Sequence, residues 1–251
     1  MIKIALVGAN GRMGQVISRM AADSDKVEIV CGIDINTQKN FDYPVYESFD
    51  DVTEEIDVII DFSHHNSLLG TLCYATKYEK PAVIATTGLT EEKKNCLEIA
   101  SKKIPIFFSA NMSLGVNLII ELAKKATQVL NGFDIEIIEK HHNQKLDAPS
   151  GTALAIADAI NETLEEPAEY IYDRHSSRKK RSKNEIGIHA VRGGTIVGEH
   201  DILFAGCDEI IEIKHTATSR EIFASGALSA AIFMYGKKRG MYSMSDLIKG
   251  E

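Results

Sequence analysis

Short apolar runs alternate with helical segments through the first half of the chain, and this alternation restricts the possible folds. The runs predict buried strands at Ile2–Val7, Val27–Ile33, Val58–Phe62, Ala82–Ala85 and Ile104–Phe108. Between them, the spacing of apolar residues predicts helices at Gly11–Ala22, Asn66–Lys77 and Thr90–Lys103. Strands that alternate with helices form a parallel sheet that is covered on both faces. We therefore expect an α/β domain with a Rossmann-like, doubly wound parallel sheet.

The second half has a different order of elements. A long helix is predicted at Leu114–Leu130, a strand at Asp134–Lys140 and a further helix after Gly151. Strand-like runs then follow one another, separated by turn residues, at Gly187–Val191, Thr195–Phe204 and Glu209–Thr216. This succession favours a second α+β domain with a mixed or antiparallel sheet. The last predicted element is an Ala-rich helix at Glu221–Tyr235.

The composition excludes several classes of protein. Hydrophobic residues make up 44% and charged residues 25% of the 251 residues, which is typical of a globular chain and not of a disordered one. With 28 basic and 36 acidic residues, the net charge of −8 argues against nucleic acid as the main partner. The apolar runs are shorter than the roughly 20 residues of a membrane span. The four cysteines form no CxxC pair, so we expect a cytoplasmic protein with no metal site and no membrane partner.

A glycine-rich turn joins the first strand to the first helix. Gly8, Gly11 and Gly14 form a GxxGxxG pattern, a variant of the dinucleotide fingerprint. Such glycines let backbone N–H groups approach a pyrophosphate at the N-terminus of the helix. Asp34 ends the second strand, 20 residues past Gly14, where an acid accepts hydrogen bonds from the adenosine ribose. The pattern predicts a dinucleotide cofactor.

The acid at Asp34 also indicates which cofactor is used, because a carboxylate repels the 2′-phosphate of NADP. No arginine follows Asp34 closely, so the sequence favours NADH over NADPH, although Lys39 or Arg12 could assist NADPH. Small and polar residues at Thr86–Gly88 and Ser109–Met112 follow two later strands. They could line the nicotinamide ribose at the carboxyl edge of the sheet, but ordinary loop chemistry explains them equally well.

The densest group of protonatable side chains follows the strand at Asp134–Lys140. His141, His142 and Lys145 lie within five residues, and such groups bind carboxylates and transfer protons near neutral pH. Residues 150–152 then start a helix, where free N–H groups suit a carboxylate. We interpret the segment as an anion site joined to a proton donor, with a solvated loop and a simple helix cap as the alternatives. A metal site is disfavoured because adjacent strand residues point to opposite faces.

The segment from Glu136 through Ala153 resembles the signature of the dihydrodipicolinate reductase (4-hydroxy-tetrahydrodipicolinate reductase) family. The resemblance covers nearly the whole chain. It includes the glycine-rich turn, Asp61-Phe62-Ser63, Thr86-Thr87-Gly88, Ala110-Asn111, the run Arg192–His200, His215, Ser219-Arg220 and Phe223–Ala227. It implies reduction of a cyclic imine, a small dicarboxylate, with NADH or NADPH in the diaminopimelate route to lysine, with hydride added to ring C4.

The resemblance also implies roles for individual residues. His141 would donate or accept a proton, and Lys145 would donate one. The substrate carboxylates would be bound by His142, Gly151 and Thr152. The cofactor would be bound by Gly8, Ala9, Asn10, Gly11, Arg12, Met13, Asp34, Ala85, Thr86, Thr87, Ser109, Ala110, Asn111 and Met112. Residues 1–112 and 221–251 would form a discontinuous dinucleotide-binding domain, and residues 113–220 a substrate-binding and oligomerisation domain whose sheet builds a homotetramer.

Three features depart from the family pattern. Ala85 stands where glycine is frequent, which affects how closely the backbone approaches the cofactor. Met112 stands where phenylalanine is common, so the position remains apolar. The stretch between Asp34 and Asp61 is short, and this concerns the adenosine side of the pocket.

Two other functions share part of the pattern. An amino-acid dehydrogenase of the aspartate or homoserine type would have the nucleotide site without the segment His141–Thr152. A nucleotide-sensing regulatory protein would need no protonatable cluster. The segment 173–185 is strongly basic, and we expect a solvated loop there, with steering or covering of an anionic substrate as the alternative. Its cations are Arg174, Arg178, Lys179, Lys180, Arg181 and Lys183.

Overall fold

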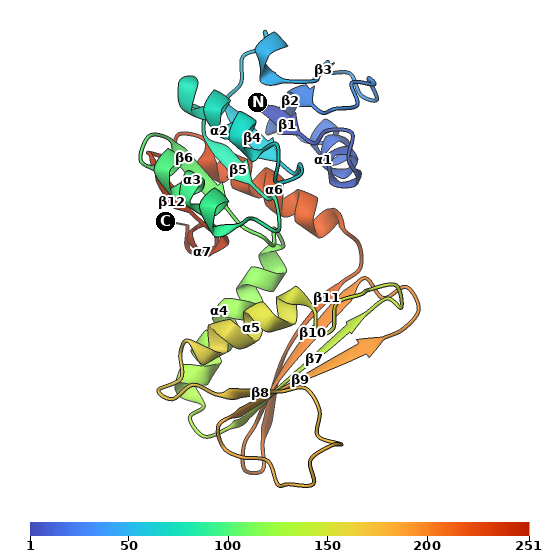
Figure 1. Ribbon diagram of the computed structural model, residues 1–251, viewed down its shortest axis with the longest axis vertical. Helices are drawn as coiled ribbons and strands as arrows, with labels where there is room; N and C mark the ends of the chain where they lie inside the picture. The colour runs from blue at the N-terminus through green and yellow to red at the C-terminus, as the bar shows by residue number, and fades with distance from the viewer. Residues whose placement is uncertain (251) are drawn as a thin grey trace. The chain divides into compact units, whose positions relative to one another are not determined.

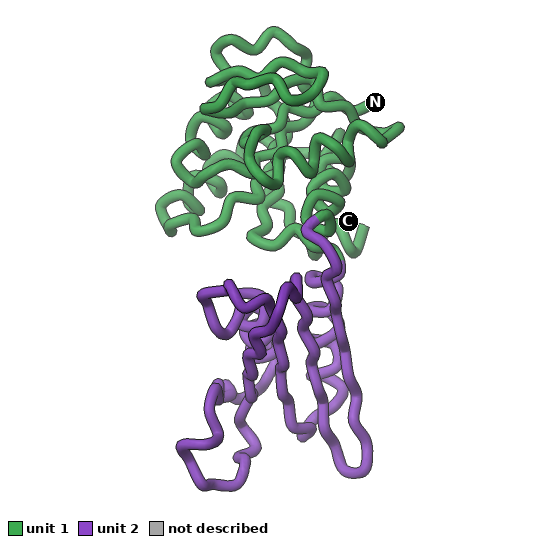
Figure 2. Tube along the Cα trace, turned by 90° about the vertical axis from the view of Figure 1, so that its right-hand side faces the viewer, with its two compact units in different colours: residues 1–114, 221–251 green, residues 115–220 purple. Residues whose placement is uncertain are grey.

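The computed structural model describes residues 1–250, which form two compact units (Figure 2). Of the described residues, 1–114 and 221–250 make up the first unit, and residues 115–220 make up the second. The first unit is therefore discontinuous in sequence. Among the described helices, none combines the length and the apolar composition of a membrane span.

A seven-stranded sheet forms the centre of the first unit, with the order β12-β6-β5-β4-β1-β2-β3. Every neighbouring pair is parallel, which confirms the predicted sheet. The strands are β1 (Ile2–Val7), β2 (Val27–Ile33), β3 (Val45–Tyr46), β4 (Val58–Asp61), β5 (Ala82–Ile84), β6 (Pro105–Phe108) and β12 (Gly240–Tyr242). The chain builds outward from β1 to β3 and then returns to place β4 on the other side of β1. Such a reversal opens a crevice for ligands at the carboxyl ends of β1 and β4.

Helices cover both faces of this sheet (Figure 1). One face carries α1 (Arg12–Ala22), α6 (Glu221–Met234) and α7 (Met244–Lys249), and the other carries α2 (Leu68–Lys77) and α3 (Glu91–Ser101). Along β1, Ile4 and Leu6 belong to the first apolar cluster, whereas Ala5 and Val7 belong to the second. A strand that is buried on both faces requires the continuous apolar run that its sequence shows.

The last long helix, α6, packs on the first sheet. It contacts α1 and the strands β4, β5 and β6. Its buried positions are mostly small, and a Cβ at Gly226 would overlap the carbonyl oxygen of Met112. The Ala-rich composition of this helix therefore permits a close approach to the rest of the unit.

The second unit contains a five-stranded sheet with the order β11-β10-β7-β9-β8. β10 is antiparallel to β7 and β11, whereas β9 is parallel to β7 and β8, so the sheet is mixed, as predicted. The strands are β7 (Asp134–His141), β8 (Glu169–Ile171), β9 (Glu185–Arg192), β10 (Gly198–Ala205) and β11 (Ile210–Ala217). Two helices, α4 (Leu114–Val129) and α5 (Gly151–Asn161), pack on one face over a core that includes Ile137, Ile188 and Phe204 (Figure 1).

Several short elements were not predicted. They are β3, β8, β12, the helix α7 and the 3-10 turn η1 (Phe49–Asp51). The missed strands have two or three residues, too few for an alternating pattern to be recognised. The predicted strand start at Thr195 is wrong, because residues 193–197 form the connection between β9 and β10.

Candidate active site

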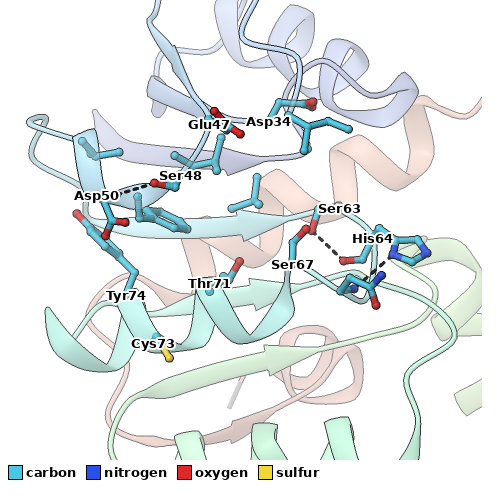
Figure 3. A pocket seen from close by; sticks show the side chains of 18 of the residues that line it. Asp34, Glu47, Ser48, Asp50, Ser63, His64, Ser67, Thr71, Cys73 and Tyr74 are labelled. Atoms are coloured by element: carbon cyan, nitrogen blue, oxygen red, sulfur yellow. Dashed lines mark hydrogen bonds between the residues drawn. The ribbon is translucent and has the colours of Figure 1, made fainter.

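A hollow of about 970 Å³ lies at the carboxyl ends of β1, β2 and β4 in the first unit (Figure 3). Gly8, Gly11 and Asp34 line it, as expected for a dinucleotide site. Much of the remaining lining comes from α2, from the residues just before it and from the segment around η1. The sequence did not predict that these segments line the cofactor site. The polar and aromatic members of that part are Glu47, Ser48, Phe49, Asp50, Ser63, His64, Asn66, Ser67, Thr71, Cys73, Tyr74, Lys77 and Tyr78. The predicted residues Ala9, Asn10, Arg12 and Met13 lie in or beside the glycine turn but outside the lining.

Two of the three fingerprint glycines are needed for the turn itself. Gly8 has a φ of +81°, and a Cβ there would lie 3.0 Å from the carbonyl oxygen of Phe62. A Cβ at Gly14 would overlap the carbonyl oxygens of Gly8 and Ala9. Glycine at both positions therefore lets α1 begin close behind β1, and its first N–H groups have no partners within the helix. This cradle fits the pyrophosphate of a dinucleotide.

The carboxylate of Asp34 is fixed against the glycine turn. Its Oδ2 accepts a hydrogen bond from the backbone N–H of Asn10 (2.9 Å), and its Oδ1 accepts one from the N–H of Asn36 (3.0 Å). The side chain of Asn10 donates to the carbonyl oxygens of Asn36 and Gln38 (2.6 and 2.8 Å). Each carboxylate oxygen keeps a lone pair for a ribose hydroxyl, so the geometry suits the predicted role.

The other predicted cofactor residues follow β5 and β6 at the same edge of the sheet, but none of them lines this hollow. They are Ala85, Thr86, Thr87, Ser109, Ala110, Asn111 and Met112. Of these, Ala85, Thr86 and Met112 are buried. Thr86 donates from Oγ1 to Asp61 (3.2 Å), which is fully buried and also accepts from the hydroxyls of Ser63 and Thr71. Asp61 thus ties together the ends of β4 and β5.

The carboxyl end of β7 holds a polar cluster in the second unit. Ile135 and Ile137 enter the apolar core, and Glu139 and His141 continue the same face of the strand. Glu139 is fully buried, and the side chain of His141 is 11% exposed. Nδ1 of His141 lies 2.7 Å from Oε2 of Glu139. The solvated-loop alternative is therefore wrong for His141.

Arg192 completes this cluster from the end of β9, where it pairs in register with His141. Its Nη1 and Nη2 donate to Oε2 and Oε1 of Glu139 (2.7 and 2.6 Å), and the backbone N–H of Ser150 also donates to Oε1 (3.0 Å). Burial raises the pKa of Glu139, but the hydrogen bonds from Arg192, His141 and Ser150 outweigh it and hold the pKa below its ordinary value. Glu139 is therefore a carboxylate at neutral pH.

His200 lies opposite Glu139 in the β7–β10 ladder, with its ring 5.3 Å from the ring of His141. Its Nε2 lies 3.0 Å from the Oγ of Ser150, and its Nδ1 is buried with no hydrogen-bond partner among residues 1–250. Burial, assisted by the neighbouring His141, lowers the pKa of His200 to about 4. His200 is therefore neutral at pH 7.

The remaining predicted residues of the segment gather at the same end of the unit. Lys145 forms an ion pair with Asp147 (Nζ to Oδ1, 2.9 Å), and this hydrogen bond lowers the pKa of Asp147. Gly151 and Thr152 are the first residues of α5, which is capped by Ser150. The helix-cap interpretation is thus correct for Ser150, whose Oγ accepts from the N–H of Ala153 (3.1 Å).

A second hollow of about 330 Å³ adjoins this cluster, and it is lined by His142, Asn143, Gln144, Gly194, Thr195, Val197 and Arg220. His142 and Arg220 are its cationic or protonatable groups, a combination that suits an anion. The sequence predicted His142 but not Arg220. Glu139, Arg192 and His200 were also missed as site residues. The alternation of β7 places Glu139 beside His141, but only the strand register brings Arg192 and His200 to them.

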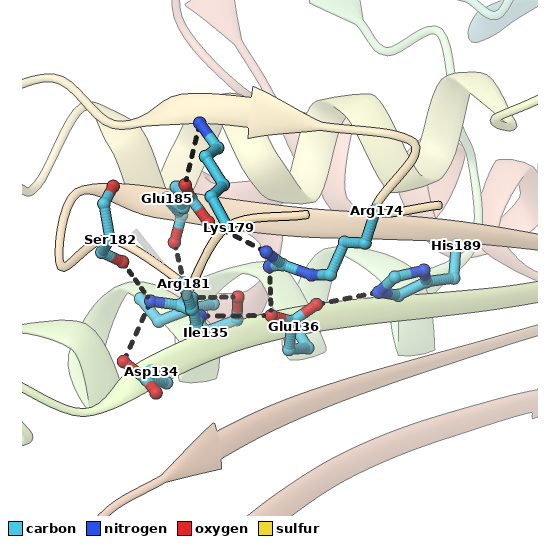
Figure 4. Close-up of polar contacts among 9 residues, drawn as sticks. All are labelled: Asp134, Ile135, Glu136, Arg174, Lys179, Arg181, Ser182, Glu185 and His189. Carbon is cyan, nitrogen blue, oxygen red and sulfur yellow. Dashed lines mark hydrogen bonds and ion pairs between the residues drawn. The ribbon is translucent and has the colours of Figure 1, made fainter. Parts of the chain in front are cut away.

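The basic segment 173–185 is held against the opposite end of β7 (Figure 4). Arg174 pairs with Glu136 and Glu185 (2.8 and 2.9 Å), and Arg181 pairs with Asp134 and Glu136 (2.8 and 3.1 Å). The prediction of a solvated loop is therefore wrong for Arg181, whose side chain is 18% exposed. Arg174 is exposed despite its ion pairs, as are Arg178, Lys180 and Lys183. Glu136, which both arginines contact, lies five residues before His141 on β7, a separation of roughly 17 Å along an extended strand. The anchored arginines are therefore remote from the cluster at His141.

Comparisons with known proteins agree with this arrangement. Residues 2–112 match the family "Dihydrodipicolinate reductase, N-terminus", and residues 115–248 match "Dihydrodipicolinate reductase, C-terminus". The chain is 56% identical to the 4-hydroxy-tetrahydrodipicolinate reductase of Caldanaerobacter subterraneus subsp. tengcongensis, with 99% of both chains covered. It is 53% identical to that of Clostridium tetani, with 99% of this chain and 97% of the relative covered.

A solved structure, the dipicolinate-bound dihydrodipicolinate reductase from Paenisporosarcina sp. TG-14, has the same fold. It aligns with a TM-score of 0.79 at 27% identity, and 97% of each chain is covered. The family matches together span both halves of the chain, including the glycine turn and the His141–Thr152 segment. The chain therefore belongs to the dihydrodipicolinate reductase family.

Proposed function

We propose that this chain is the NAD(P)H-dependent 4-hydroxy-tetrahydrodipicolinate reductase of diaminopimelate and lysine biosynthesis. The observation that carries the proposal is that, in a chain of this family, the end of β7 meets the N-terminus of α5: Glu139, which contacts His141, accepts a hydrogen bond from the N–H of Ser150, the residue that caps α5. Protonatable groups beside a helix N-terminus together suit a small dicarboxylate that must be bound and protonated. A regulatory protein without turnover would have no use for them.

The residues of the second unit would bind the substrate and supply the proton. His142, Gly151 and Thr152 bind the substrate carboxylates, and Arg220 assists from the wall of the hollow that His142 lines. Loss of the C4 hydroxyl of 4-hydroxy-tetrahydrodipicolinate as water gives the unsaturated imine, dihydrodipicolinate. When bound, the reduced nicotinamide supplies the hydride that is added to ring C4 of this imine. Lys145 or His141 then protonates the resulting enamine, and tetrahydrodipicolinate is the product. The protein contributes position and electrostatics to this reaction.

The first unit would bind the cofactor through residues 8–13 and Asp34, with residues 85–87 and 109–112 on the nicotinamide side. NADH is the preferred cofactor in this proposal. The hollow is lined by the carboxylates of Asp34, Glu47 and Asp50, and Lys77 is the one lysine or arginine in its lining. Such a lining repels a 2′-phosphate. A tenfold lower KM for NADPH than for NADH would refute this preference.

The assembly and location follow from the same assignment. The enzyme acts in the cytoplasm as a homotetramer formed through the second unit. Exposed apolar side chains on its edge strand β11, Ile210 and Ile211, support an interface there, with 64% and 37% of their surfaces exposed. Light scattering during size-exclusion chromatography tests this, and a monomer at micromolar concentration would contradict it.

The direct test is an assay of NADH oxidation with freshly prepared 4-hydroxy-tetrahydrodipicolinate. The wild-type protein should consume NADH only when the substrate is present. Lys145→Ala should lower turnover by about a hundredfold or more, as expected for removal of a positioned acid. Lys180→Ala is the matched control, because this lysine is exposed in the segment 173–185. No substrate-dependent oxidation by the wild type would refute the function, and near-wild-type turnover of Lys145→Ala would refute the role of Lys145.

A further inference from the structure

Glu139 accepts four hydrogen bonds, two at each oxygen of its carboxylate. Oε1 accepts from Arg192 Nη2 (2.6 Å) and from the backbone N–H of Ser150 (3.0 Å). Oε2 accepts from Arg192 Nη1 (2.7 Å) and lies 2.7 Å from Nδ1 of His141. The side chain is fully buried, so solvent does not compete for these contacts. A bidentate arginine fixes the plane of a carboxylate as well as its position.

The charge state of Glu139 determines which nitrogen of His141 carries the proton. An ionised carboxylate only accepts hydrogen bonds, so the Nδ1 that contacts it must be an N–H donor. In the neutral imidazole the other nitrogen, Nε2, is then the acceptor, and in the imidazolium it is the donor. Nε2 is therefore the nitrogen that gains and loses a proton.

Gly198, the first residue of β10, lies beside Nε2 of His141. A Cβ at Gly198 would lie 3.1 Å from Nε2 and 3.4 Å from Cδ2 of the ring. Glycine at this strand position therefore leaves free the space that a side chain would fill. Among the charged and titratable groups around the ring, Glu139 contacts Nδ1, Arg192 pairs with Glu139, and the ring of His200 on β10 lies 5.3 Å away. The backbone carbonyl of Asp147, which pairs with Lys145, accepts a hydrogen bond from Arg192.

We infer that Glu139, locked by Arg192, is the positioning residue that holds His141 as the Nδ1–H form, so that Nε2 exchanges the proton with the substrate. The inference deepens the proposed function and rests on it for the substrate. In the transfer, the Nε2–H bond breaks and its electron pair stays on the ring nitrogen, while the proton bonds to the enamine carbon. Glu139 keeps its charge and its contact with Nδ1 throughout the transfer.

The first experiment is independent of turnover. Nitrogen-15 NMR of the imidazole groups, with the His141 signals assigned by their loss in His141→Asn, identifies the protonated nitrogen in the neutral ring. The inference requires Nδ1 to be protonated and Nε2 to be unprotonated. A neutral ring protonated at Nε2 overturns it, whether or not the protein reduces the substrate. An inactive wild type with the required tautomer would instead refute the proposed function alone.

The second experiment separates positioning from folding. Glu139→Gln should lower kcat by about a hundredfold while KM for both substrates stays within about threefold, and the pH profile of kcat should shift. Because Glu139→Gln leaves Arg192 without its anion, the double variant Glu139→Gln/Arg192→Met removes both charges and should fold with the same low kcat. The matched control is Glu136→Gln, since Glu136 on the same strand also contacts a histidine and arginines (His189, Arg174 and Arg181).

The outcome is decided by comparing these variants. Glu136→Gln should keep kcat within about threefold of the wild type. A folded double variant with kcat within threefold of the wild type overturns the inference. If neither Glu139 variant folds, as judged by circular dichroism, Gly198→Ala tests the same nitrogen from the other side. It should lower kcat at least tenfold by crowding Nε2, and unchanged turnover with a well-folded protein overturns the assignment of Nε2.

Discussion

Acid should destabilise this protein through His200 before the carboxylates titrate. The imidazole is buried beside Ser150 and His141, and its pKa is lowered from the ordinary 6.5 to about 4. Between these two values the unfolded chain binds a proton that the folded chain refuses. Stability is therefore lost as the pH falls from about 6.5 towards 4, and this group has little effect above pH 7.

The size of the effect follows from the two pKa values. One pKa unit corresponds to about 1.4 kcal/mol, so the loss relative to pH 7 is about 2 kcal/mol at pH 5 and about 3 kcal/mol at pH 4. The assay is urea denaturation from pH 7 to pH 4.5, followed by circular dichroism, for the wild type and for His200→Gln. The side-chain amide of glutamine can occupy the position of the His200 Nε2 and so keep the contact with the Oγ of Ser150. Glutamine has no titratable group.

The comparison isolates His200 from the carboxylates, which titrate in both proteins. The difference in unfolding free energy between wild type and His200→Gln should change by about 2 kcal/mol between pH 7 and pH 5, in favour of the variant at low pH. The control is His175→Gln, because His175 is exposed. It measures how much the replacement of a histidine by glutamine changes the unfolding free energy where no buried imidazole is removed. A difference that stays constant over this range would refute the claim that His200 is buried and neutral.

Three further predictions concern other parts of the molecule. Asp34→Ala should raise KM for NADH about tenfold and reduce the preference over NADPH, because the ribose loses its acceptor; an unchanged ratio of the two KM values would contradict the cofactor assignment. Arg220→Met should raise KM for the substrate about tenfold with less effect on kcat, and steady-state kinetics that show the reverse would exclude Arg220 from substrate binding. The hydrogen bond from Arg174 lowers the pKa of Glu185 from 4.5 to about 2, so this pair stabilises the fold above pH 4.5 and the effect is lost as the pH falls towards 2. The unfolding free energy of Glu185→Gln should therefore change less between pH 4.5 and pH 2 than that of the wild type. Identical acid-denaturation curves for the two proteins would contradict the ion pair between Arg174 and Glu185.

The sequence predicts the long elements well because their apolar patterns are complete. The strands β1 and β2 and the helix α1 follow from unbroken runs and regular spacing, and the glycine turn between β1 and α1 is bounded by both. The two-residue strand β3 and the three-residue strands β8 and β12 carry no such pattern. They exist because a neighbouring strand offers free backbone groups, which is information from tertiary structure.

In the site, the sequence likewise predicts the residues that are close together in the chain and misses those that only strand pairing brings together. His141, His142 and Lys145 are visible in sequence because they lie within five residues of one another. Arg192 is 53 residues from Glu139, and only the parallel pairing of β7 with β9 brings its guanidinium to that carboxylate. The basic segment 173–185 was misjudged for a similar reason, since the acids that bind Arg174 and Arg181 lie on β7 and β9.

The proposed function requires transfer of hydride from a nicotinamide to ring C4 of a cyclic dicarboxylate. NADH that carries deuterium at the transferred position of the nicotinamide tests this transfer. The product, isolated and examined by NMR and mass spectrometry, should contain one deuterium at ring C4, and no deuterium should be found at the carbon that is protonated. A product without deuterium, or with deuterium at another ring position, would contradict the account.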